Sequence, residues 1–205
     1  MYRKYLKRLG DVALCLLALP VLLPLFLILS LAIRLDSKGP VIFVQKRVGK
    51  DKRHFTIYKF RTMKTDAPKE VPTHLIGDPA AYMTRLGSLL RKTSLDELPQ
   101  LLNIFKGDMS LVGPRPALWN QFDLIAERDK YNANSVRPGL TGWAQINGRD
   151  TLEIPVKAKL DGEYVERMSY LFDLRCFFGT IVSIFKREGV VEGGTGALNN
   201  KEDKK

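Results

Sequence analysis

The chain has 205 residues, enough for one compact domain with an appended segment and a sizeable buried core. Its 33 Lys and Arg residues against 22 Asp and Glu residues give a net charge of +11, which indicates an anionic partner: nucleic acid, lipid headgroups or a phosphorylated substrate. Its two cysteines, Cys15 and Cys176, lie too far apart in sequence to form a metal-ligand pair, and we expect both to be reduced, buried thiols.

Residues 1–11 carry four basic side chains among aromatic and aliphatic ones, a pattern typical of a short amphipathic segment lying on anionic headgroups. The next 22 residues, Val12–Ile33, contain no charge. A run of this length can cross a bilayer, because about 20 apolar residues cover about 30 Å of hydrocarbon. It is too long for a removable signal peptide, and no small-residue cleavage pattern precedes Arg34.

Two arguments favour a re-entrant membrane helix over a spanning one. Pro20 and Pro24 fall in the middle of the run, where each removes a backbone donor and clashes with the preceding turn, so we expect a sharp bend. Basic residues flank both ends of the run, so the positive-inside rule favours translocation of neither flank. A helix that enters, turns at the prolines and leaves by the same face satisfies both observations. A proline-kinked spanning helix is the alternative.

After residue 40 the pattern changes to β-branched and aromatic residues. Segments 41–48 and 54–61 flank a turn-like stretch and predict a β-hairpin. Residues 64–79 are polar and proline-rich, which predicts a surface loop. Helical patterns are predicted at 80–91 and within 96–105, 117–129 and 151–168, with a glycine-rich segment at 136–149.

Tyr170–Phe185 is again strongly apolar, but its 16 residues, with Asp173 and Arg175 among them, are too few to span a bilayer. We expect an interfacial helix, or one packed under the first hydrophobic segment. The overall expectation is an α+β fold: a mostly helical membrane-surface domain with a small β-hairpin. Its expected divisions are 1–36 (basic lead-in and re-entrant helix), 37–188 (main domain) and 189–205 (mobile tail).

The stretch Arg91–Pro116 holds the residues best suited to chemistry, the adjacent carboxylates Asp96 and Glu97 between basic residues. Ser94 followed by Glu97 before an apolar run also forms a capping-box pattern, and on these residues alone the capping interpretation is the stronger one. The cap does not exclude chemistry. A carboxylate at a helix N-terminus stays ionised, which suits a nucleophile or a Mg²⁺ ligand, and the same helix end attracts phosphate.

Arginines at two other places fit the same chemistry. Prolines on both sides of Arg115 fix its backbone, and a guanidinium held in this way suits bidentate phosphate binding. The alternative is an ordinary strand that ends in a proline turn. Arg137 and Arg149 bracket the glycine-rich segment, whose backbone amides either approach a ligand closely or only form turns.

Four separated motifs cover much of the chain: Lys59-Phe-Arg-Thr-Met63, Arg91-Lys-Thr-Ser-Leu-Asp-Glu-Leu-Pro-Gln-Leu-Leu-Asn103, Lys106-Gly-Asp-Met-Ser-Leu-Val-Gly-Pro-Arg-Pro116 and Arg137-Pro-Gly-Leu-Thr-Gly-Trp-Ala-Gln-Ile-Asn-Gly-Arg149. In this order they resemble the bacterial sugar transferase family, the monotopic polyprenyl-phosphate phosphoglycosyltransferases, and in particular its small members. The family anchor is a re-entrant helix–break–helix, often marked by Ser-Pro. Here Leu23-Pro24 stands at that break, with an extra Pro20.

The resemblance implies a reaction: with Mg²⁺, a sugar 1-phosphate passes from a UDP-sugar to polyprenyl (undecaprenyl) phosphate. It implies that Asp96 is the nucleophile, which expels UMP and carries the phosphosugar, and that Glu97 assists by binding metal or positioning Asp96. Asp96 and Glu97 are thus the implied Mg²⁺ ligands. The implied phosphate and substrate ligands are Lys59, Arg61, Arg91, Arg115, Arg137, Gln145 and Arg149. Asp173 is either a further site residue or part of an interior ion pair with the neighbourhood of Arg175.

The resemblance also implies a location and partners. The location is the bacterial inner (cytoplasmic) membrane, with the catalytic domain facing the cytoplasm. The reaction would be the first membrane step of glycoconjugate synthesis (capsule, O-antigen, exopolysaccharide or glycoprotein glycan). Downstream glycosyltransferases are the further partners. A nucleic-acid partner is not expected. The main rival, a basic protein that only binds nucleic acid or anionic lipid, does not explain why basic residues cluster around Asp96 and Glu97. A P-loop kinase is disfavoured because the chain has no Gly-x-x-x-x-Gly-Lys-Ser/Thr motif.

Overall fold

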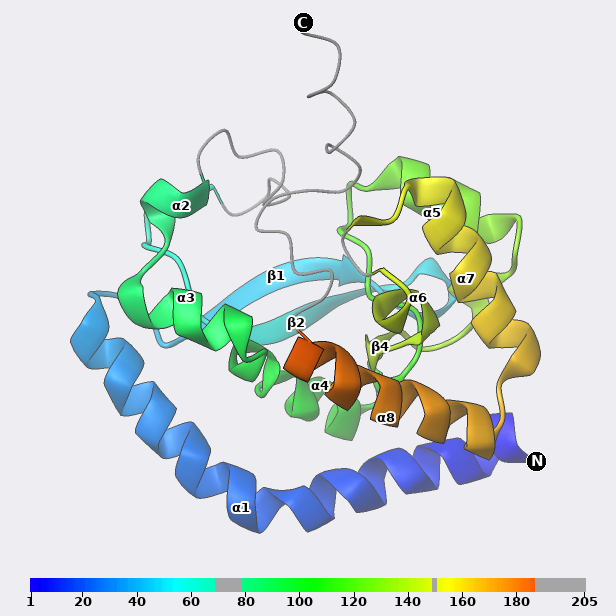
Figure 1. Ribbon diagram of the computed structural model, residues 1–205, viewed down its shortest axis with the longest axis horizontal. Coiled ribbons are helices and arrows are strands. Elements are labelled where there is room, and N and C mark those ends of the chain that lie inside the picture. The colour runs from blue at the N-terminus through cyan, green and yellow to red at the C-terminus, as the bar shows by residue number, and fades with distance from the viewer. Residues whose placement is uncertain (69–78, 149–150, 187–205) are drawn as a thin grey trace, which may run out of the picture.

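The computed structural model describes residues 1–68, 79–148 and 151–186, and the expected tail at 189–205 lies outside them. Helices predominate, and two small two-stranded sheets lie among them (Figure 1). The α+β class predicted from the sequence is therefore confirmed. Both cysteines are buried and free, as predicted.

The N-terminal segment forms one long helix. A π-helical turn, Tyr2–Leu6, continues into α1, Lys7–Asp36, which contains Pro20 and Pro24. In Figure 1, α1 changes direction near its middle and follows two sides of the molecule. Of the helices in the described ranges, it is the one long and apolar enough to cross a membrane. Its apolar side chains buried against the rest of the protein are Cys15, Leu29 and Ile33. Many of its other leucines are exposed, so α1 has more apolar surface than the domain covers.

The predicted hairpin is confirmed. Strands β1 (Ile42–Val48) and β2 (His54–Phe60) pair antiparallel along their full lengths. Ile57 and Phe60 are buried in two apolar clusters that also contain α1 side chains. The hairpin therefore packs against α1. Its Lys59 side chain faces the turn that carries Asp96 and Glu97.

The helix expected at 80–91 is interrupted. It forms α2 (Pro79–Tyr82) and α3 (Arg85–Lys92), because Thr84 is extended and its hydroxyl caps α3 by accepting a hydrogen bond from the Gly87 amide at 2.9 Å. At Gly87 a Cβ would lie 2.0 Å from the Thr62 carbonyl oxygen. Glycine thus lets α3 pack directly on the segment that follows β2.

The capping-box interpretation of Ser94 and Glu97 is wrong. Ser94 has a left-handed backbone, with φ of 57°, and its side chain makes no cap hydrogen bond to the short 3₁₀ turn η4 (Leu95–Glu97). This turn leads into α4 (Gln100–Lys106), which ends at Gly107 with φ of 96°. Glycine is favoured at such a left-handed end position because it has no Cβ. The Glu97 side chain instead contacts Lys59 of the hairpin.

The second sheet lies in regions where the sequence predicted no paired strands. β3 (Ser110–Val112) pairs in parallel with β4 (Gly139–Thr141), which belongs to the glycine-rich segment. Helices were predicted where α5, α7 and α8 are found, whereas α6 was not predicted. Their bounds are Phe122–Asp129 for α5, Trp143–Ile146 for α6, Ile154–Arg167 for α7 and Tyr170–Lys186 for α8.

Helix α8 has one buried and one exposed apolar side. Phe172 and Cys176 are buried, whereas Leu171, Phe178 and Val182 are exposed. Helix α8 packs against α6, β3 and β4, and in Figure 1 it lies on the side of the domain that α1 follows. The exposed apolar side chains of α8 and α1 are what an interfacial arrangement requires.

Polar contacts attach α8 to the start of the chain. The Lys7 ammonium lies 2.5 Å from the Asp173 carboxylate, and the Tyr2 hydroxyl donates to the same oxygen at 2.5 Å. The Tyr164 hydroxyl lies 2.8 Å from the other oxygen. Asp173 is therefore part of an interior ion pair, as one of the two alternatives expected, but its ion-pair partner is Lys7 and not a residue near Arg175.

Candidate active site

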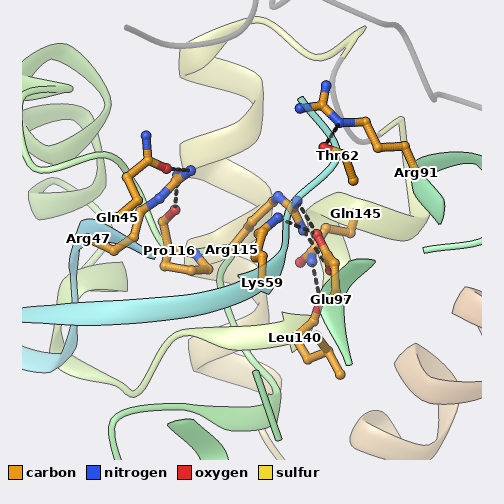
Figure 2. Close-up of polar contacts among 10 residues, drawn as sticks. All are labelled: Gln45, Arg47, Lys59, Thr62, Arg91, Glu97, Arg115, Pro116, Leu140 and Gln145. Carbon is orange, nitrogen blue, oxygen red and sulfur yellow. Dashed lines mark hydrogen bonds and ion pairs between the residues drawn. The ribbon is translucent and has the colours of Figure 1, made fainter. Parts of the chain in front are cut away.

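The two adjacent carboxylates lie on the turn between α3 and α4, and both are buried, with 7% of each residue exposed. Glu97 Oε1 accepts from Lys59 Nζ at 2.8 Å and from Arg115 Nη2 at 2.6 Å, while Arg115 Nη1 lies 3.4 Å from Oε2 (Figure 2). The Asp96 carboxylate makes no hydrogen bond or ion pair with any residue that the structure describes. One carboxylate is thus held by two cations, and its neighbour is available for a ligand.

Arg47 of β1 adds a third cation. Its Nη2 donates to Gln45 Oε1 at 2.6 Å and its Nη1 to the Pro116 carbonyl oxygen at 3.0 Å (Figure 2). Burial, followed by the positive charge of Arg115, lowers the pKa of Arg47 to about 9, while Glu97 acts in the opposite direction. The guanidinium therefore stays protonated at neutral pH. In the sequence, Arg47 is one of the basic residues that flank the apolar run and not a predicted site residue, because strand pairing is what brings it here.

The charges in this cluster are out of balance, with three cations (Arg47, Lys59 and Arg115) around two carboxylates. Burial lowers the pKa of Lys59, and Arg115 and Arg47 lower it further, while Glu97 and Asp96 raise it. Such an arrangement favours an added anion, because an anion offsets the mutual repulsion of the cations.

The ionisation of Asp96 has a different origin from the one predicted. Burial raises the pKa of Asp96 and the charge of Glu97 raises it further, whereas Lys59, Arg91 and Arg115 lower it. Asp96 also lies in a short 3₁₀ turn that no capping box stabilises. The nearby cations, and not a helix N-terminus, therefore favour the ionised form.

The backbone that carries Arg115 is held by the β3–β4 pairing. Hydrogen bonds join the Gly113 amide to the Thr141 carbonyl at 2.8 Å and the Gly139 amide to the Pro114 carbonyl at 2.9 Å. A Cβ at Gly113 would lie 2.6 Å from the Arg137 carbonyl oxygen, so this close approach requires glycine. The two readings of the Pro-Arg-Pro stretch are thus compatible: a strand does end in a proline turn, and that turn presents Arg115 to Glu97.

Two further predicted residues lie near the cluster. Arg91 donates from Nε to Thr62 Oγ1 at 2.9 Å, and its guanidinium lies apart from Glu97 in Figure 2. Gln145 lies beside Glu97 and Arg115 in the same view. Its Nε2 donates to the Leu140 carbonyl at 2.9 Å, and its buried Oε1 has no hydrogen-bond partner within residues 1–68, 79–148 and 151–186.

The remaining predicted ligands are not brought to the cluster. Arg61 donates to the Ser37 carbonyl at 2.7 Å and to the Lys38 carbonyl, just past the end of α1. Arg137 donates from Nε to the Gly107 carbonyl at 2.8 Å, just past the end of α4. Cations favour these positions because helix C-termini carry partial negative charge. Arg149 lies outside the described residues.

The carboxylates fit Mg²⁺ as a partial set of ligands. Mg²⁺ prefers oxygen ligands, keeps several waters, and is commonly bound through one or two carboxylates together with substrate phosphates. Asp96 offers a carboxylate without a partner in the described part of the chain, and the Glu97 carboxylate lies on the same turn. Within that part, no group of three or more His, Cys, Asp and Glu residues could hold a metal. A Mg²⁺ ion would therefore need phosphate oxygens as well.

Comparison with known proteins gives a consistent result. The family model described as bacterial sugar transferase matches residues 2–187. The chain is 40% identical over 185 residues to the uncharacterized sugar transferase EpsL of Bacillus subtilis, a match that covers 90% of each chain.

Two longer relatives have names that state a reaction. The chain is 39% identical over 196 residues to the UDP-glucose:undecaprenyl-phosphate glucose-1-phosphate transferase of Escherichia coli, covering 89% of this chain and 40% of that protein. It is 39% identical over 186 residues to the UDP-N-acetylgalactosamine-undecaprenyl-phosphate N-acetylgalactosaminephosphotransferase of Aeromonas hydrophila, covering 88% of this chain and 44% of that protein. The chain thus spans less than half the length of these two relatives.

Proposed function

This chain belongs to the bacterial sugar transferase family and is a transferase of the phosphoglycosyl class, and we propose that it moves a sugar 1-phosphate from a UDP-sugar to polyprenyl phosphate with release of UMP. One observation carries the proposal: Lys59 and Arg115 converge on Glu97, and Asp96 beside them has no partner in the described part of the chain. Convergent cations suit a diphosphate donor. The names of the Escherichia coli and Aeromonas hydrophila relatives each contain a UDP-sugar and undecaprenyl phosphate, which supports this substrate pair.

The proposed reaction has two displacements at one phosphorus atom. An Asp96 carboxylate oxygen attacks the sugar-linked phosphorus, and the bond from this phosphorus to the oxygen that bridges the diphosphate breaks. UMP leaves with that oxygen and the bonding electron pair, and the phosphosugar remains on Asp96 as an acyl phosphate. A phosphate oxygen of the polyprenyl phosphate then attacks the same phosphorus, the Asp96–phosphorus bond breaks, and the carboxylate is restored.

The other residues act on charge and position. Lys59 and Arg115 offset the negative charge that develops as the Asp96 carboxylate approaches the diphosphate. Glu97 holds these two cations next to Asp96. Arg91, whose charge acts on Asp96, and Gln145, near Glu97 in Figure 2, would contact the nucleotide sugar. Mg²⁺ would be held by Asp96 and Glu97 and would neutralise part of the diphosphate charge. Arg61 and Arg137 donate to backbone carbonyls instead, so we leave them out of the substrate contacts.

We further propose that α1 is re-entrant and turns at Pro20 and Pro24, so that the catalytic domain, residues 37–188, lies against the cytoplasmic face of the inner membrane. The direction change of α1 in Figure 1 and the exposed apolar side chains of α1 and α8 support this arrangement. It brings Asp96 to the level where a lipid phosphate and a soluble nucleotide sugar meet. The product would begin a glycoconjugate, which downstream glycosyltransferases would extend.

Single cysteines at the exposed positions Lys4 and Lys38 test the topology. A membrane-impermeant thiol reagent should label both from the cytoplasmic side of inverted membrane vesicles. A cysteine introduced in the exposed turn at Lys50 serves as the control for the cytoplasmic domain. Labelling of the first two cysteines from opposite sides would show a spanning helix and overturn the re-entrant arrangement.

UMP release tests the reaction itself. The full-length protein in membranes with Mg²⁺ and undecaprenyl phosphate should release UMP from at least one member of a panel of UDP-sugars. Asp96→Asn should abolish release, and Asp129→Asn, at an exposed carboxylate on α5, should not. With donor but no acceptor, mass spectrometry should find a sugar phosphate on the wild-type protein and none on Asp96→Asn. Release by Asp96→Asn at the wild-type rate would rule out this nucleophile, and no release from any UDP-sugar by the wild type would rule out the function.

A further inference from the structure

Two consecutive peptide carbonyls at Arg115 are each held by a separate arginine. The Arg115 carbonyl oxygen accepts from Arg128 Nη2 at 2.9 Å. The next carbonyl oxygen, that of Pro116, accepts from Arg47 Nη1 at 3.0 Å (Figure 2). Arg47 comes from the hairpin and Arg128 from α5, so the two elements hold the Pro-Arg-Pro turn from different parts of the fold.

Arg128 is fixed by a buried ion pair. Its Nε and Nη2 donate to Asp161 Oδ2 at 2.8 and 2.6 Å, and the side chains are 4% and 1% exposed. Asp161 belongs to α7, which packs against α5. The nitrogen that reaches the Arg115 carbonyl is therefore held in place by the packing of two helices.

Arg47 has neutral partners at the same turn. Its hydrogen bonds in the described part of the chain go to the Gln45 amide oxygen and the Pro116 carbonyl oxygen, and to no carboxylate. The positive charge of Arg115 also lowers the pKa of Arg47, because the two like charges repel each other. A buried cation without a direct counter-ion is unfavourable for folding alone. The presence of Arg47 next to the cluster, with both of its acceptors neutral, points to a role in the site.

We propose that Arg47 is a positioning residue that, with Arg128, clamps the two peptide carbonyls at Arg115 and thereby aims the Arg115 guanidinium at Glu97 and the bound diphosphate. The main chain at residues 115 and 116 then cannot rotate independently of the hairpin and α5. Because the clamp acts on the backbone, the Arg115 side chain needs less reorganisation when the anion binds.

The kinetic consequence of the clamp rests on the proposed function, whereas its geometric consequence does not. The geometric consequence is measured by nuclear magnetic resonance of arginine side chains in the full-length protein in lipid nanodiscs. The Arg115 guanidinium N–H signals, assigned by their loss in Arg115→Lys, should be resolved in the wild type, because the two-point contact with Glu97 slows rotation. Arg47→Gln should broaden them, and Lys52→Gln should not.

Lys52→Gln is the matched control because it removes a positive charge from the same hairpin at an exposed ion pair with Asp129. Unchanged Arg115 signals in Arg47→Gln would overturn the clamp, whatever reaction the protein performs. Absent UMP release together with the expected signal changes would instead remove the proposed function and leave the clamp standing. The two failures are therefore distinguishable.

A double-mutant cycle gives the kinetic test. Arg47→Gln should lower kcat/KM for UMP release by about a hundredfold, since a small misplacement of a catalytic group can have an effect of this size. In the Arg115→Gln background, the same substitution should lower it by less than about twofold, because residues that act through one another are not additive. An equal loss in both backgrounds would show a general structural effect and contradict the clamp.

Arg47→Lys separates charge from geometry and is the second variant if Arg47→Gln does not fold. Lysine keeps the positive charge but lacks the planar fork that reaches two acceptors. It should lose at least about tenfold in kcat/KM while its thermal unfolding midpoint stays near that of the wild type. Full activity in Arg47→Lys would show that charge alone is sufficient and would reject the clamp.

Discussion

Two buried carboxylates, Glu97 and Asp173, each contact a lysine and other donors, yet their surroundings differ. Asp173 binds the Lys7 ammonium at 2.5 Å, and tyrosine hydroxyls lie within hydrogen-bond distance of both its oxygens. The Lys7 ammonium balances the Asp173 carboxylate there, and the other donors are neutral hydroxyl groups. Around Glu97, Lys59 and Arg115 share a single carboxylate, with Arg47 nearby.

The difference separates a structural ion pair from a functional site. The Asp173 network has its charges balanced, so it joins α8 to the start of the chain and needs no ligand. The Glu97 cluster has an excess of positive charge next to Asp96, a carboxylate with no partner in the described part of the chain. A folded protein that keeps such an imbalance buried loses stability unless an anion binds, so the imbalance supports the proposal that the phosphorylated substrate binds here. The following changes test this contrast, starting with the largest expected effect.

Arg115→Gln should lower kcat/KM for UMP release by about two to three orders of magnitude, because it removes a charged donor directed at the developing negative charge. The unfolding midpoint should change little, since the substitution also relieves repulsion among the cations. Arg167→Gln is the control, as it removes an arginine from a surface pair with Glu163, at 2.5 Å with the arginine side chain 47% exposed. A similar loss of activity in both variants would erase the distinction between the two kinds of ion pair.

Asp173→Asn should give the opposite result, with a loss of about 3 kcal/mol in the free energy of unfolding, because Lys7 is left buried without its counter-ion. The rate of UMP release per folded molecule should stay within about threefold of the wild type. Chemical denaturation in nanodiscs measures the first quantity, and the same sample gives the second. A variant of normal stability that does not release UMP would move Asp173 into the active site.

Arg61→Gln should lower the free energy of unfolding by about 1–2 kcal/mol, because the two carbonyls past the end of α1 lose a charged donor. UMP release should remain within about threefold of the wild type. Steady-state kinetics on the purified full-length variant check this. A large rise in KM for the UDP-sugar would restore Arg61 to the substrate ligands, as the sequence motif had indicated.

Lys59→Met should shift the acid limb of the kcat/KM–pH profile to higher pH. Burial already raises the pKa of Asp96, and Lys59 is the largest influence that lowers it. Removing the lysine charge therefore raises this pKa further, and the nucleophile becomes protonated at a higher pH. The profile, scaled to its own maximum, is compared with that of Lys50→Met in the exposed turn of the hairpin. An acid limb that moves to lower pH in Lys59→Met would refute the charge assignment.

Local patterns predicted much of the fold but little of the pairing between distant segments. The hairpin follows from β-branched alternation around a turn, and α5, α7 and α8 follow from helical spacing. The parallel pairing of β3 with β4 was missed, because each strand has three residues and their partnership spans almost thirty positions. The capping box failed for a related reason. Glu97 has stronger partners in Lys59 and Arg115 than the backbone amide it was expected to reach.

The candidate site shows the same division. Motif resemblance brought Asp96, Glu97, Lys59 and Arg115 into one hypothesis, and three of these four meet in the structure through direct contacts. It also included Arg61 and Arg137, which hold carbonyls beyond helix ends, and it missed Arg47 and Arg128. Nothing in the chemistry of a single arginine distinguishes a guanidinium that binds phosphate from one that holds a carbonyl.

The sequence by itself determined the apolar N-terminal helix, the basic balance, the adjacent carboxylates and the proline-framed arginine, because these depend on residue type and short-range spacing. Only the tertiary structure decided which cations remain near Asp96 and which are used elsewhere. The physical reason is that the helix ends and strands packed beside an arginine determine whether its guanidinium contacts an anion or backbone carbonyls. Packing, rather than the number of charges, therefore places Asp173 in a structural ion pair and leaves Asp96 without a partner in the described part of the chain.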